Sequence, residues 1–73
     1  MALNYTHHAQ NRINEREIDL DKIEAAVAND ANPWEEVIGG GNHKRYFHKE
    51  VTVITNLRSD TVVTAWRGKR GNW

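Results

Sequence analysis

Two histidines and two arginines near the N-terminus carry the side chains best suited to acid–base chemistry on a phosphate. They lie in the segment "YTHHAQNRINEREI", residues 5–18, as His7, His8, Arg12 and Arg16. In a helix, His8, Arg12 and Arg16 recur every fourth residue and form one stripe. A first-turn imidazole is disfavoured in its charged form and can accept a proton, while a guanidinium stabilises a developing phosphorane. The spacing is therefore typical of phosphodiester cleavage, or else of a solvated helix face whose arginines pair with nearby glutamates.

A second basic and aromatic cluster, "HKRYFH", spans residues 43–48. Strand alternation would place Lys44, Tyr46 and His48 on one face, and His43, Arg45 and Phe47 on the other. Cations interleaved with rings are typical of single-stranded RNA binding, although a charged edge strand is the simpler alternative. Four residues of this cluster and two of the last expected strand are the candidate substrate-binding residues: Lys44, Arg45, Tyr46, His48, Trp66 and Arg67.

Other chemistries find little support in the spacing of the residues. His7 and His8 diverge by about 100° on a helix, and His43 and His48 fall on opposite strand faces, so neither pair favours a metal site. Ser59 is the only serine, and the triple glycine at 39–41 does not make a phosphate loop. We expect no metal and no cofactor.

The composition predicts one small domain, residues 1–73, without cysteine. No apolar run is long enough to span a membrane and no signal peptide is recognisable, so we expect a soluble cytoplasmic protein without membrane contact.

The charges are unevenly distributed along the chain. Residues 1–40 contain three basic and eight acidic residues, a net of −5, and residues 41–73 contain seven and two, a net of +5. The basic half could face phosphates, neutralise the acidic half of the same molecule, or meet that of a second copy in a homodimer.

The order of elements predicts an α+β fold, with two N-terminal helices packed on one face of a four-stranded antiparallel sheet. Thr6 should cap a helix over 7–17, and Asp19 a second helix that buries Leu20, Ile23 and Val27. The expected strands are residues 34–38, 43–48, 51–56 and 61–67.

We expect the last two strands to form a hairpin about Arg58. Val53 would then face Val63, and Ile54 would face Val62. The face with Val53 would receive the helices, and the face with Ile54 and Trp66 would stay partly open.

With these elements in order, the chain resembles the DUF4258 family over about residues 5–67. The likeness rests on a His-Ala-x-x-Arg-x-x-x-Arg signature, here His8-Ala9, Arg12 and Arg16, and on a Thr-x-aromatic signature, here Thr64 and Trp66. That family is thought to share the fold of the RelE-like, colicin-type and barnase-like ribonuclease toxins. The resemblance implies an RNA-cleaving or RNA-binding function, with His8, Arg12, Arg16 and Thr64 as the catalytic positions.

The first functional hypothesis is a metal-independent, toxin-type ribonuclease of bacterial or phage origin that leaves a 2′,3′-cyclic phosphate. His8, or else His48, would act as base on the ribose 2′-hydroxyl, an arginine (Arg12, Arg16 or Arg67) would stabilise the phosphorane, and Thr64 would bind a phosphate oxygen. The alternative is a non-catalytic inhibitor or adaptor that binds a protein partner, such as an antitoxin or an inhibited target. Its interface would then be the charged surface with Trp66 and Trp73.

Overall fold

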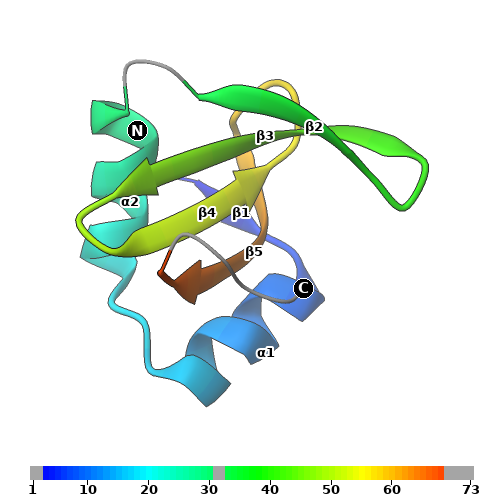
Figure 1. Cartoon of the computed structure of the whole chain (residues 1–73). Helices are drawn as coiled ribbons and strands as arrows, with labels where there is room; N and C mark the ends of the chain where they lie inside the picture. Colours follow the sequence, from blue (N-terminus) through cyan, green and yellow to red (C-terminus); the bar gives the residue numbers. More distant parts are fainter. Residues whose placement is uncertain (1–2, 31–32, 69–73) are drawn as a thin grey trace.

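The computed structural model describes residues 3–30 and 33–68, which form an α+β fold with two helices and a five-stranded mixed sheet (Figure 1). The elements in chain order are β1 (Asn4–Tyr5), α1 (His7–Arg16), α2 (Leu20–Asn29), β2 (Trp34–Ile38), β3 (Gly41–His48), β4 (Val51–Thr55) and β5 (Thr61–Arg67). The strand order is β1-β5-β4-β3-β2. Within the described ranges, neither helix is long and apolar enough to cross a membrane.

The sheet contains one strand more than the four that the sequence predicts. All four expected strands are present and pair antiparallel, while the additional strand β1 pairs in parallel with the start of β5. With two residues, β1 is too short to show an alternating pattern, so local sequence could not reveal it.

Both helices begin at the residues expected to cap them. The Thr6 hydroxyl accepts a hydrogen bond from the Ala9 N–H at 3.0 Å, and an Asp19 carboxylate oxygen accepts one from the Asp21 N–H at 2.9 Å. Helix α1 ends one residue earlier than predicted, because Glu17 adopts a left-handed conformation with φ of 51°.

The buried side of α2 differs from the expected one at its first residue. Leu20 is 49% exposed, whereas Ile23 and Ala26 are fully buried and Val27 is half-buried. The expectation for Leu20 was wrong because the buried stripe begins one turn into the helix, where it faces β3 and β4.

Tight turns join the middle strands. Gly39 and Gly40 have φ of 58° and 82° between the paired residues Ile38 and Gly41, so the glycines form the predicted turn. Two positive φ values in a two-residue hairpin loop define a type I′ turn, which glycine adopts at no steric cost.

The register between β4 and β5 is the main correction to the predicted fold. Val53 pairs with Ala65 and Ile54 with Thr64, two positions further along β5 than expected. A bulge follows Ile54, so that Thr55 pairs with Val62. The even shift keeps most side chains on their predicted faces, but the extra bulge residue turns Val62 from the open face into the core.

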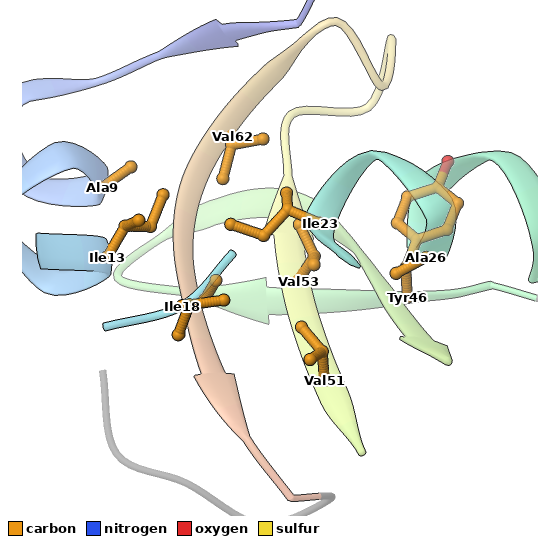
Figure 2. Close-up of a cluster of buried hydrophobic side chains, with 10 residues drawn as sticks. Ala9, Ile13, Ile18, Ile23, Ala26, Tyr46, Val51, Val53 and Val62 are labelled. Carbon is orange, nitrogen blue, oxygen red and sulfur yellow. The ribbon is translucent and has the colours of Figure 1, made fainter. Parts of the chain in front are cut away.

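The core lies between the two helices and one face of the sheet (Figure 2). Its buried members are Ala9, Ile13, Ile18, Ile23, Ala26, Tyr46, Val51, Val53, Val62 and Ala65.

The opposite face of the sheet is more covered than expected. Thr52, Ile54 and Thr64 are fully buried there and Trp66 is 4% exposed, so the prediction of a partly open face is wrong at these positions. Part of the cover is visible: the Arg45 guanidinium lies 5.4 Å from the centre of the Trp66 ring, and the Thr52 hydroxyl donates to the Gly68 carbonyl oxygen at 2.5 Å.

Candidate functional site

Helix α1 lies along the part of β5 that β1 leaves uncovered (Figure 1). At its start, the Thr6 hydroxyl donates to the Val63 carbonyl oxygen at 3.3 Å. At its end, Arg16 Nη1 donates to the Ala65 carbonyl oxygen at 2.7 Å, and Arg67 Nη2 donates to the Glu17 carbonyl oxygen at 2.8 Å. These contacts run in the same order along both elements, so the helix and the strand lie side by side.

The predicted stripe of α1 is present, and its three members differ in exposure. His8 is exposed in the first turn, whereas Arg12 and Arg16 are half-buried. Arg12 Nη1 forms an ion pair with Glu15 Oε1 at 2.9 Å, as the alternative interpretation of a paired helix face expected. Within the described residues, the buried Arg12 Nε has no hydrogen-bond partner. Arg12 therefore keeps one buried donor unused.

Thr64 lies next to the residues that bind α1, but its side chain is enclosed. It stands between Val63 and Ala65, whose carbonyl oxygens α1 binds, and it is fully buried. Among the residues that the structure describes, its hydroxyl has no hydrogen-bond partner. A buried polar group without a partner costs about 1–3 kcal/mol, and native structures contain few of them. Thr64 thus carries an unused hydroxyl that becomes accessible only if its cover moves.

The six candidate substrate-binding residues divide between the two faces of the sheet. Lys44, Tyr46 and His48 pair with Thr55, Val53 and Val51, so the three share one face, as strand alternation predicted, and this face is the helix side of the sheet. Tyr46 is 5% exposed within the core, and its hydroxyl group is hydrogen-bonded to the Ser59 hydroxyl group. Its ring is therefore packed in the core and is not available to bind a base.

Of the remaining three candidates, two lie on the opposite face of the sheet and one lies at the end of α1. Arg45 and Trp66 contact each other on the opposite face, and Arg45 Nη1 also pairs with Glu36 Oε2 at 3.2 Å. Arg67 is exposed and bonded to the end of α1, so it adds a cation to the α1–β5 flank.

Sequence reasoning missed Trp34 as a surface residue on the face of Arg45 and Thr64. Cross-strand register connects Trp34 to Arg45, Arg45 to Ile54, and Ile54 to Thr64, so the four form one row across the sheet. Trp34 is 67% exposed at the outer end of this row. The sequence does contain a signal for this position, because a two-residue turn at Gly39–Gly40 fixes the register of its two strands and pairs Trp34 with Arg45.

Comparisons with protein-family models, curated proteins and solved structures found no match to this chain. In the part of the chain that the structure describes, no three side chains of His, Cys, Asp or Glu gather into a group that could hold a metal ion. Trp73, considered as an interface residue, lies outside the described residues.

Proposed function

We propose that this chain is a small, metal-independent, ribonuclease-like domain of the toxin type, related to the DUF4258 family that it resembles. The observation that carries the proposal is the hydrogen bond from Arg16 to the Ala65 carbonyl oxygen. It joins the helix that carries His8 and Arg12 to the strand that carries Thr64, although the Thr64 side chain belongs to the face of the sheet opposite the helix core. Two buried donors without a partner among the described residues, Arg12 Nε and the Thr64 hydroxyl, also support the proposal.

The chemistry would begin at His8, whose exposure allows a macromolecular substrate to reach it. The imidazole removes the proton from a ribose 2′-hydroxyl, and the 2′-oxygen attacks the adjacent phosphorus. The bond from phosphorus to the 5′-oxygen of the next nucleotide then breaks, and that oxygen takes up a proton from the imidazolium or from water. The products are a 2′,3′-cyclic phosphate and a 5′-hydroxyl, and no metal is required.

Arginines of the α1–β5 flank would stabilise the charge on the phosphorane. Arg12 can turn from Glu15 to a phosphate oxygen, because an ion pair this exposed contributes little to stability. Arg16 has a different part: its bond to Ala65 positions the helix, while its charge adds to the local field. Thr64 would donate its hydroxyl to a phosphate oxygen once its cover has opened.

The neighbouring histidines provide a matched pair of variants for the test. His7 and His8 are both exposed in the first turn of α1, but they point in directions about 100° apart. In the presence of a chelator, the wild type and His7→Ala should cleave single-stranded RNA to products ending in a cyclic phosphate. His8→Ala should be slower by about 10²–10⁴-fold, the usual contribution of a general base.

Three results would speak against parts of this proposal. Equal cleavage by both histidine variants would remove His8 from the mechanism. RNA that is bound but never cut would leave a binding module, recognisable by affinity that falls steeply with salt. RNA that is neither bound nor cut would favour the protein-binding alternative.

A further inference from the structure

Strand β2 forms the outer edge of the sheet, at the end away from β5 and α1. Its residues Trp34 and Val37 are 67% and 70% exposed. Natural edge strands are usually protected by proline, lysine or a bulge. The five residues Trp34–Ile38 include none of these side chains, and their pairing with β3 is regular throughout. Apart from the negative charge of Glu35 and Glu36, nothing within β2 itself opposes the addition of another strand.

The register shows which backbone groups of β2 face outward. Ile38 and Gly41 flank the two-residue turn and therefore form a hydrogen-bonded pair. Because such pairs alternate in an antiparallel ladder, Glu36 and Trp34 also direct their N–H and C=O groups toward β3. Glu35 and Val37 direct theirs away from the sheet, where an added strand would meet them.

Charge decides which kind of strand fits this edge. Glu35 is exposed, the Glu36 side chain is 39% exposed although it bonds to Arg45, and β2 contains no basic residue. Pairing the whole strand antiparallel with that of a second copy would place Glu36 directly opposite Glu36, which is destabilising. A segment with lysine or arginine opposite these glutamates would instead gain two cross-strand pairs of opposite charge.

We propose that the edge of β2 is a docking site for an extended, basic segment of a partner protein, which adds a strand to the sheet. The partner's backbone would bind the outward groups of Glu35 and Val37, and its cations would face Glu35 and Glu36. This surface lies at the other end of the sheet from the α1–β5 flank. The inference therefore goes beyond the proposed ribonuclease function and does not depend on it.

The test uses a capped peptide, Thr-Val-Lys-Lys-Val-Thr, titrated into the isotopically labelled protein and followed by NMR. The amide signals of Glu35 and Val37 should shift, and their hydrogen exchange should slow, while the amides of α1 stay unchanged. The same peptide with glutamate for both lysines should bind at least about tenfold more weakly. The lysine peptide methylated on alternate backbone nitrogens should not bind, because it cannot form the ladder.

A pair of variants on the protein side separates backbone docking from side-chain contact. Val37→Pro removes an outward N–H and should abolish binding, while Val37→Ala keeps that N–H and should largely retain it. Thermal unfolding of both variants verifies that the fold persists. If Val37→Pro unfolds, the methylated peptide still tests in the wild type whether backbone hydrogen bonds carry the binding.

Each remaining outcome would overturn the docking proposal. Equal binding of the glutamate peptide would refute the charge argument. A dimer that Val37→Pro dissociates would identify a second copy as the occupant. Shifts at Glu35 and Val37 with a ribo-oligonucleotide but not with the lysine peptide would assign the edge to RNA.

Discussion

Arg16 and Ala65 are 49 positions apart in the chain, and their hydrogen bond of 2.7 Å joins helix α1 to strand β5. The guanidinium binds a main-chain carbonyl oxygen on the strand edge that β1 leaves uncovered. A single side chain thereby binds one carbonyl oxygen at the edge of the sheet and links helix α1 to strand β5. Arg16 thus has a structural role in this fold, whatever its part in chemistry.

Replacing Arg16 and, as a control, Arg67 should separate the structural role of Arg16 from the general effect of removing an arginine. Arg16→Ala leaves the Ala65 carbonyl oxygen without this donor and should lower the free energy of unfolding by about 1.5–3 kcal/mol, the usual range for a bond to a charged group. Arg67→Ala removes a bond to Glu17 that is exposed to water, and because solvent screens and replaces such a contact it should cost below about 1 kcal/mol. Urea unfolding of both variants measures the difference, and equal losses would contradict the special role of Arg16.

Thr64 should show opposite effects on stability and on function. Thr64→Val keeps the shape but removes a buried hydroxyl that has no partner among the described residues. The free energy of unfolding should therefore stay equal or rise by about 1 kcal/mol, because the desolvation penalty disappears. If the hydroxyl binds phosphate in the reaction, cleavage of RNA should fall at the same time. Chemical unfolding and a cleavage assay on the same sample check both parts. A clear loss of stability in Thr64→Val would show that the Thr64 hydroxyl forms a stabilising hydrogen bond in the wild type.

The turn between β3 and β4 should be open to stabilisation. Lys49 and Glu50 have φ of 46° and 73° between the paired residues His48 and Val51, so two non-glycine residues occupy a type I′ turn. Left-handed conformations cost such residues about 1–2 kcal/mol each. Replacing both with Asn-Gly, the pair preferred in this turn, should raise the free energy of unfolding by roughly 1 kcal/mol or more. An unchanged melting temperature in calorimetry would show that other contacts of Lys49 or Glu50 outweigh the relief of strain.

Asp60 should make the stability of the fold depend on pH in the acid range. Its carboxylate accepts hydrogen bonds from Asn56 Nδ2 at 2.6 Å and from Thr61 Oγ1 at 3.0 Å, which lower its pKa from the ordinary 3.8. A lowered pKa in the folded state stabilises the fold above the unfolded-state value, and this contribution is lost as the pH falls through the folded-state value.

The wild type should therefore lose stability as the pH falls below about 4, the range in which an unfolded aspartate takes up its proton. Asp60→Asn should lose less over the same range, because the amide does not titrate. Urea unfolding between neutral and acid pH compares the two, and parallel curves would show that other carboxyl groups control the acid transition.

Local chemistry determined much of the secondary structure before any tertiary contact was considered. The helix caps Thr6 and Asp19 and the turn at Gly39–Gly40 were predicted, because each depends on residues only a few positions apart. The bounds of β2 and β5 agree with the prediction as well, since alternation and β-branched residues are local signals.

Only the tertiary structure decided which faces and partners these elements acquired. The bulge after Ile54 turned Val62 into the core, and a strand of two residues changed the edge of the sheet, although neither has a local signature. The long Arg16 side chain could have paired with a nearby glutamate or with a distant carbonyl oxygen, and the choice of Ala65 followed from where β5 came to lie. Such outcomes depend on how distant segments pack together, because register, burial and the partner of a flexible cation are properties of two elements and not of one.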